Sequence, residues 1–157
     1  QLSEAFSFGA SITEVEVDPE TGIVKALEVT AAQDCGFALN PMLVEGQCVG
    51  AAVMSIGQTL WEDVMREDGK ILNPSFLDYK MPTAMDLPPL ENIMHKNAGS
   101  PDPNGPFGAK EAGEGIGTGV PGALANAIYD AVGVRIKSSP ITPEKILQAL
   151  KEKEGKE

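Results

Sequence analysis

Apolar and polar residues alternate along residues 11–30, which is the pattern of a half-buried β-hairpin. Valines alternate with glutamates up to Val17, and apolar residues return at even spacings after residue 22. The five residues between, DPETG, combine proline, glycine and an aspartate that can bond its own backbone, which is typical of a turn. The pattern therefore predicts two antiparallel strands joined at residues 18–22, with one face of the pair against a core.

A long helix is predicted over residues 42–62. Asn40 and Pro41 are typical of an N-cap and a first helical position. On a wheel of about 100° per residue, the glycines at 46, 50 and 57 fall within about 40° of one another. Gln47 and Gln58 share a second direction, about 100° from the glycines. Glycine is costly inside a helix unless something packs closely on it, so this face predicts either tight packing or a ligand surface.

The rest of the chain mixes irregular segments with shorter elements. Prolines exclude a regular helix over residues 73–90, and residues 99–106 form a loop by every local signal. We expect a turn at 66–70, a short strand at 91–98, a helix at 120–133 with Pro121 in its first turn and Gly133 after its end, a strand at 134–136, and a helix at 141–157 capped by Thr142. The fold class is α+β: an N-terminal β-hairpin, a glycine-rich helix, an irregular segment and two further helices in one domain.

Composition and charge restrict the function. The net charge of −11 argues against binding to nucleic acid or to an anionic membrane surface, both of which need clustered Lys and Arg. No apolar run is long enough to span a bilayer and no signal peptide is visible, so we expect a cytoplasmic protein. Cys35 and Cys48 suit a reducing compartment. His95 is the only histidine, and we expect it to be structural or exposed rather than a metal ligand.

The segment GPFGAKEAGEGIGTG, residues 105–119, is rich in glycine and carries Glu111 and Glu114. A nucleotide-binding loop would need an apolar strand directly before it or a closing Gly-Lys-Ser/Thr, and neither is present. A structural loop is the default for such a composition. The third interpretation is an acid/base site, because a carboxylate among glycines loses part of its hydration and can be approached closely. Under that interpretation Glu114 is the candidate base.

Four segments carry a resemblance to a known family. They are GAKEAGE at 108–114, DCGFALNPMLVEGQCVGAAVMSIGQTLWED at 34–63, LNPSFLDYKMPTAMDLPP at 72–89 and NAIYDAVGVRIKSSPITPEKIL at 126–147. In their order along the chain they are similar to the C-terminal portion of the molybdenum-cofactor-binding subunit in the xanthine dehydrogenase/aldehyde oxidase family of molybdenum hydroxylases. The first is similar to the loop that carries the family's catalytic glutamate. The resemblance covers nearly the whole chain and implies that residues 1–157 are the C-terminal part of a molybdopterin-binding domain.

The resemblance assigns roles to individual residues. It implies that Glu114 is the base that takes the proton of a hydroxide bound to molybdenum. It implies that Gln47 hydrogen-bonds the molybdenum cofactor, and that Gly46 and Gly113 permit its close approach. No residue of this chain is expected to ligate the metal.

Two neighbours of Glu114 have other expected roles. Glu111 stands where many relatives have glycine, and we expect it to be a flanking charge, paired with Lys110. Phe107 is expected to pack in the core, with the lining of a substrate pocket as the alternative.

The resemblance also implies cofactors and partners beyond this chain. The cofactor is a molybdopterin that carries or lacks a cytosine nucleotide, and iron–sulfur clusters and FAD reside on partner chains or domains. Two cysteines cannot supply the four ligands of a cluster. The expected partners are the remainder of the molybdenum subunit, an iron–sulfur subunit, a FAD subunit and a small-molecule substrate.

The expected reaction is hydroxylation of an aromatic heterocycle, a purine or an aldehyde with oxygen derived from water. The isolated chain is expected to be inactive, because a complete molybdenum subunit is several times longer. The alternative is a non-catalytic structural or assembly module that has kept the same fold.

Overall fold

The alternating N-terminal residues form a β-hairpin, as predicted. In the computed structural model, which describes residues 5–155, β1 (Gly9–Val17) pairs antiparallel with β2 (Val24–Gln33). The strands extend beyond the predicted 11–30 at both ends. Asp18 closes the turn, because its carboxylate accepts hydrogen bonds from the Glu20 amide at 2.9 Å and the Thr21 hydroxyl at 2.7 Å.

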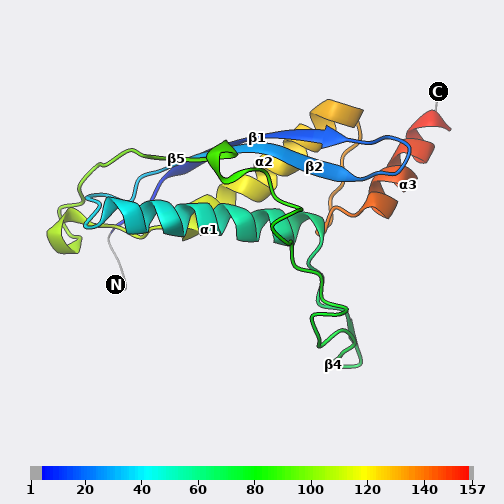
Figure 1. Ribbon diagram of the computed structural model, residues 1–157, viewed down its shortest axis with the longest axis horizontal. Coiled ribbons are helices and arrows are strands. Elements are labelled where there is room, and N and C mark those ends of the chain that lie inside the picture. The colour runs from blue at the N-terminus through cyan, green and yellow to red at the C-terminus, as the bar shows by residue number, and fades with distance from the viewer. Residues whose placement is uncertain (1–4, 156–157) are drawn as a thin grey trace.

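A third strand completes the sheet. β5 (Ile93–Asn97) confirms the short strand predicted at 91–98 and pairs parallel with β2, which gives the order β1-β2-β5. Parallel neighbours require a long crossover. Here the crossover contains α1 (Pro41–Leu60), a small hairpin of β3 (Arg66–Glu67) and β4 (Lys70–Ile71) that stands away from the body, and the single turn η1 (Leu90–Asn92) (Figure 1).

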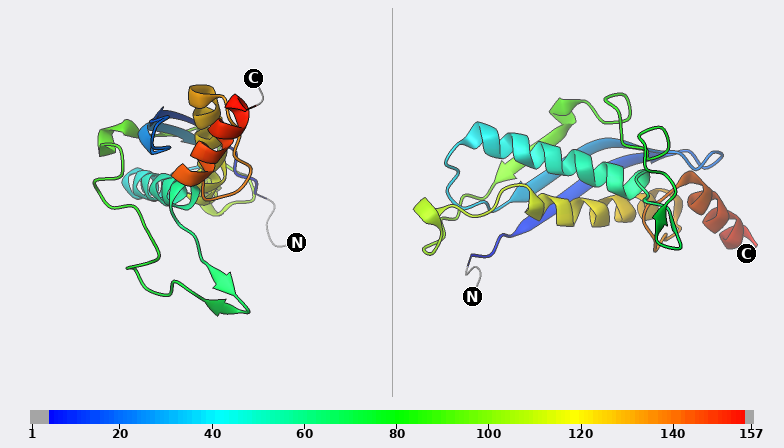
Figure 2. Two further views of the ribbon diagram at one scale, coloured as in Figure 1. Left: turned by 90° about the vertical axis from the view of Figure 1, so that its right-hand side faces the viewer. Right: turned by 90° about the horizontal axis from the view of Figure 1, so that it is seen from below.

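Two long helices, α1 and α2 (Glu114–Val132), lie side by side along the sheet (Figure 2). The Asn40 side chain accepts a hydrogen bond from the Leu43 amide at 3.2 Å, as expected of the N-cap of α1. Between sheet and helices lies one apolar core, whose fully buried members include Val29, Ala52, Ile56, Ile116, Val120, Leu124 and Ile128. Within the described residues, no helix is long and apolar enough to cross a membrane.

The start of α2 corrects the sequence prediction. The helix begins at Glu114 rather than at residue 120, so Pro121 lies in its interior and not in its first turn. The glycines that resembled a loop let this part of α2 lie against β1, since a Cβ on Gly119 would stand 2.8 Å from the Ser11 hydroxyl. Pro121 has no N–H for the Gly117 carbonyl, which instead lies 3.4 Å from the Ser55 hydroxyl of α1. Packing therefore overrides local propensity here.

The C-terminal region is partly as predicted. Gly133 adopts a left-handed conformation and caps α2, with its amide 2.7 Å from the Tyr129 carbonyl. The strand predicted at 134–136 is wrong: Val134 packs inward, but the segment joins neither sheet. α3 (Pro143–Glu154) confirms the predicted helix and its cap Thr142, whose hydroxyl accepts from the Lys145 amide at 3.5 Å. The helix is shorter than the predicted 141–157, of which residues 156–157 lie outside the described part of the chain.

Candidate functional site

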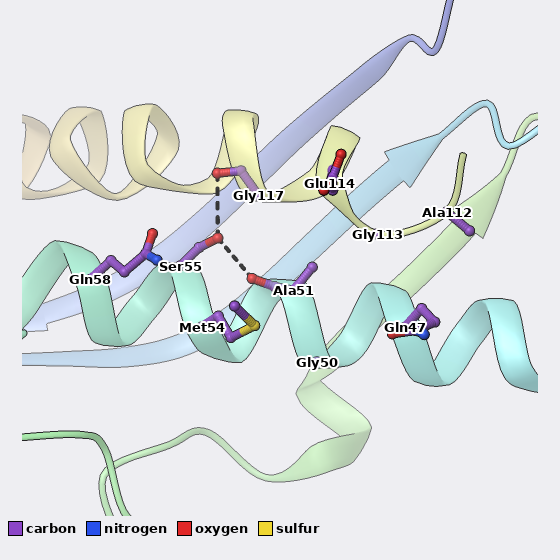
Figure 3. Close-up of a pocket in the computed structure, with 10 residues that line it drawn as sticks. All are labelled: Gln47, Gly50, Ala51, Met54, Ser55, Gln58, Ala112, Gly113, Glu114 and Gly117. Atoms are coloured by element: carbon purple, nitrogen blue, oxygen red, sulfur yellow. Dashed lines mark hydrogen bonds between the residues drawn. The ribbon is translucent and has the colours of Figure 1, made fainter. Parts of the chain in front are cut away.

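A pocket of about 380 Å³ lies between α1 and the first turn of α2 (Figure 3). We call it the α1–α2 pocket. One face of α1 and the junction before α2 supply its lining: Gln47, Gly50, Ala51, Met54, Ser55, Gln58, Ala112, Gly113, Glu114 and Gly117. The residues from α1 recur at intervals of three and four, so they share one side of that helix. The parallel arrangement of the two helices thus brings residues far apart in the sequence to one surface.

The α1–α2 pocket brings together three of the four predicted site residues. Gln47 comes from α1, and Gly113 and Glu114 form the start of α2. The fourth, Gly46, is exposed on α1 and does not line the pocket. The pairing of Gln47 with the Gly113–Glu114 turn across the two helices is the central feature of the site.

The polar groups of this pocket are available to a ligand. Within residues 5–155, the side-chain amides of Gln47 and Gln58 and the carboxylate of Glu114 have no hydrogen-bond partner or ion pair. Glu114 is exposed, so residues of this chain do not provide the loss of hydration that the sequence analysis expected of it. The pocket presents two neutral amides and one free carboxylate at its surface.

The glycines of α1 do not share one role, although the sequence places them on one face. A Cβ added at Gly46 or Gly50 would meet no atom within 4 Å. A Cβ added at Gly57 would collide with Glu62 and Pro82. Tight packing therefore explains Gly57 only, while Gly46 and Gly50 leave space that the described part of the chain does not fill.

The turn before Glu114 is fixed by buried contacts. Gly113 has φ 116° and ψ −55°, a backbone conformation that only glycine adopts readily. Its amide donates to the Gln33 side-chain oxygen at 3.0 Å, and a Cβ there would approach the Gln47 carbonyl at 3.4 Å. Gln33 is only 1% exposed and ends β2. The sheet thus holds the residue that precedes the candidate base.

The expected ion pair between Lys110 and Glu111 is wrong. Lys110 instead pairs with Asp34 at 2.6 Å, with both side chains at most 10% exposed. The hydrogen bond from Lys110, together with the amides of Gly36 and Ser100, holds the pKa of the Asp34 carboxyl below its ordinary value. This pair ties the end of β2 to the segment before Glu114, and it leaves Glu111 for other partners.

The core position expected for Phe107 is also wrong. Its side chain is 87% exposed and does not line the α1–α2 pocket, and its backbone has a left-handed φ of 56°. It belongs to the single turn η2 (Pro106–Gly108).

Three further residues that the sequence analysis weighed lie inside the fold. Cys35 and Cys48 are buried and free, and burial raises the pKa of both thiols, that of Cys48 to about 11. His95 lies on β5 outside the α1–α2 pocket, and burial lowers its pKa while Glu45 opposes the shift. Neither thiol is therefore poised as a thiolate nucleophile at neutral pH.

Sequence reasoning missed the buried Gln33 and the pocket residue Ser55, and it aligned Gln58 with Gln47 without assigning Gln58 to a site. Gln33 occupies an inward position of β2, where Val29 and Ala31 are apolar, and that break in the alternation is the signal that could have found it. Ser55 and Gln58 recur with Gln47 at helical spacing, but their facing α2 depends on tertiary packing that no local pattern contains.

Comparison with known proteins agrees with the geometry. A family described as "Molybdopterin cofactor-binding domain" matches residues 1–88. The chain is 39% identical to the 6-hydroxypseudooxynicotine dehydrogenase complex subunit gamma of Paenarthrobacter nicotinovorans, over 90% of this chain and 18% of that protein. It is 35% identical to the xanthine dehydrogenase molybdenum-binding subunit of Escherichia coli, over 90% of this chain and 19% of that protein.

A solved structure extends the likeness to the fold. The aldehyde oxidoreductase of Desulfovibrio gigas superimposes with a TM-score of 0.83 at 34% identity, over 92% of this chain and 15% of that one. The chain thus spans less than a fifth of the length of each of these three proteins. The family match, the relatives and the fold agree: the chain belongs to the molybdopterin cofactor-binding domain family, within the xanthine dehydrogenase/aldehyde oxidase group of molybdenum oxidoreductases.

Proposed function

We propose that this chain forms part of the active site of a molybdenum hydroxylase and that Glu114 is its general base. The observation that carries the proposal is the α1–α2 pocket, where Glu114 and Gly113 meet Gln47 although the two segments lie far apart in the sequence. A free carboxylate beside unpartnered amides can both bind a polar ligand and accept a proton from it.

The residues of this pocket fit a molybdopterin. Gly50 lines the pocket, and the absence of any atom near a Cβ added there leaves a cradle for a flat ring system. The amides of Gln47 and Gln58 offer donors and acceptors that match the polar edge of a pterin.

The chain's own residues then take defined parts. Gln47 hydrogen-bonds the cofactor, Gly113 lets it approach the start of α2, and Gly46, which is open beside Gln47, leaves room for it. The cofactor, when bound, supplies an oxygen derived from water and takes up the electrons of the oxidation. Glu114, whose carboxylate is free and lines the same pocket, would accept a proton from the group bound there.

The relatives' names support a class of substrate, while the partners proposed here are those that the sequence resemblance implies. The relatives named above are a 6-hydroxypseudooxynicotine dehydrogenase, a xanthine dehydrogenase and an aldehyde oxidoreductase. We propose an aromatic heterocycle, a purine or an aldehyde as substrate. The chain would work with the remainder of a molybdenum subunit, an iron–sulfur subunit and a FAD subunit, around a molybdopterin with or without a cytosine nucleotide.

The test is Glu114→Gln in the complex purified from its native host through a tag on this chain. The amide keeps the size of the side chain but cannot accept the proton, so we expect turnover to fall by at least about 100-fold. Molybdenum and pterin content should stay unchanged. Glu144→Gln, at the first turn of α3, is the matched control and should behave as the wild type.

Three outcomes would count against this proposal. Turnover retained in Glu114→Gln would remove the base assignment. A complex without molybdenum would favour the non-catalytic module instead. Because most of the relatives' length lies outside this chain, we also expect the isolated chain to retain no cofactor and to turn over no substrate, and activity of that chain would contradict the proposal.

A further inference from the structure

Gln33 is a buried amide that joins three elements. Its oxygen accepts from the Gly113 amide at 3.0 Å and from the Cys48 thiol of α1 at 3.3 Å. Its nitrogen donates to Glu111, at 2.6 Å to the carboxylate and 3.1 Å to the backbone carbonyl, and lies 3.3 Å from the Ser7 hydroxyl. An amide that is 1% exposed with both ends engaged is strongly oriented.

Glu111 carries the same contact network into α2. The carboxylate oxygen that accepts from Gln33 also accepts from the Gly115 amide at 3.1 Å. Gly115 is the second residue of α2, and the N-cap Gly113 has no side chain to cap the helix. Glu111 therefore satisfies a first-turn amide that would otherwise lack a partner within the helix.

These hydrogen bonds hold the backbone on both sides of the candidate base and do not involve its side chain. The amides immediately before and after Glu114 belong to Gly113 and Gly115, and the first is held by Gln33 while the second is held by Glu111. Neither Gln33 nor Glu111 lines the α1–α2 pocket. The pair thus fixes the backbone on both sides of Glu114 and leaves its carboxylate free.

The same amide also contacts α1, the helix that forms the other wall of the pocket. Cys48, which donates to Gln33, follows Gln47 directly on α1. One buried side chain, Gln33, is therefore hydrogen-bonded both to the helix that carries Gln47 and to the turn that precedes Glu114.

We propose that Gln33 and Glu111 are positioning residues for Glu114, an inference that rests on the proposed role of Glu114 as base. They hold the first turn of α2, and with it the backbone that places Glu114 in the α1–α2 pocket together with Gln47. Proton transfer is sensitive to such placement, since a misplacement of about 1 Å can cost about 100-fold in rate. Removing the pair should slow the chemical step and leave the binding of substrate and cofactor intact.

The experiment compares Glu111→Ala with Glu111→Gln in the holoenzyme complex. Alanine removes the acceptor of both hydrogen bonds, whereas glutamine keeps an acceptor oxygen at the same reach. We expect alanine to lower kcat by about 10- to 100-fold, with KM and molybdenum content within about threefold of wild type. Glutamine should restore most of kcat, and Glu144→Ala, the same change at the first turn of α3, should have no effect.

A readout independent of turnover follows the hydrogen bond itself. Hydrogen exchange of the peptide that covers residues 113–117 should be at least about fivefold faster in Glu111→Ala, because the Gly115 amide loses its hydrogen bond to a charged acceptor. Gln33→Leu removes every hydrogen bond of the Gln33 side chain and should give a similar loss of kcat. The double variant of Gln33→Leu with Glu111→Ala should lose little more kcat than either single variant.

The outcomes separate this proposal from the assignment of Glu114. If Glu114→Gln abolishes turnover while Glu111→Ala keeps wild-type kcat and exchange, the positioning role is overturned and the base assignment stands. If Glu111→Ala loses activity only in proportion to lost molybdenum, or if glutamine fails to rescue it, the positioning role is also overturned. If Glu114→Gln retains turnover, the base assignment itself fails.

Discussion

Gly36, in the segment that follows β2, and Gly50, in the α1–α2 pocket, differ in what surrounds them. Gly36 has a left-handed φ of 66°, and a Cβ added there would collide with the carbonyl oxygen of Gly108. Gly50 is helical, and a Cβ added there would meet nothing within 4 Å. The first glycine lets the chain pack on itself, while the second leaves room for a group that the chain does not contain. One residue type therefore serves folding at one position and binding at another.

The largest effect should come from Gly36→Ala. The segments around Gly36 and Ala109 pair through the amides of Lys110 and Phe37, each 2.8 Å from a carbonyl of the other segment. A side chain would force these backbones apart and adopt a strained φ, so we expect a loss of about 3 kcal/mol or more in the free energy of unfolding. Urea unfolding followed by the fluorescence of the single Trp61 measures it.

Gly69→Ala is the matched control for that loss. Gly69 also has a left-handed φ, of 77°, but nothing lies within 4 Å of an added Cβ. It should therefore cost only the backbone strain, about 1 kcal/mol. Equal losses at the two positions would show that the contact with Gly108 is unimportant.

A smaller effect is expected from Asp34, whose carboxylate holds the Gly36 amide at 3.1 Å. Its pKa is lowered in the folded protein, so its stabilisation is complete above the unfolded pKa near 4 and is lost as the pH falls through the folded value. Asp34→Asn should cost about 2 kcal/mol at pH 7, because hydrogen bonds to a charged group are lost. The difference from wild type should shrink as the pH approaches 3.

Unfolding curves between pH 3 and pH 7 measure this dependence. Asp86→Asn is the control, because Asp86 also has a lowered pKa but is exposed and bonds only Thr83. Its effect at pH 7 should be smaller than that of Asp34→Asn. A constant difference between Asp34→Asn and wild type at every pH would contradict the role of the ionised carboxylate.

These two regions also show how far sequence reasoning reaches. Alternation predicts the hairpin, and Asn40 with Pro41 predicts the start of α1, because the causes are local. The partner of Lys110 is not local: Asp34 lies 76 positions away, and the adjacent Glu111 is the wrong choice.

The candidate site divides in the same way. The sequence resemblance predicts that Glu114 and Gln47 belong to the site. Their meeting in one pocket, however, depends on how α1 packs on α2. The interior position of Pro121 likewise depends on contacts with β1 and Ser55 that no helix propensity contains. Local patterns predict elements, and the geometry of the site arises where distant elements meet.

The smallest effect on stability should come from Gly50→Ala, and its sign should be opposite. Alanine is favoured over glycine inside a helix by about 1 kcal/mol, and here no atom opposes the methyl group. The chain should therefore become more stable by up to about that amount. If the space at Gly50 is reserved for the cofactor, the same methyl group should lower molybdenum and pterin content of the purified complex by several-fold.

Gly122→Ala separates the two effects, because Gly122 lies in α2 with the same open surroundings but outside the α1–α2 pocket. It should give the gain in stability with full cofactor content. Full cofactor content in Gly50→Ala as well would mean that both glycines are simply exposed, and that the contrast with Gly36 concerns folding alone.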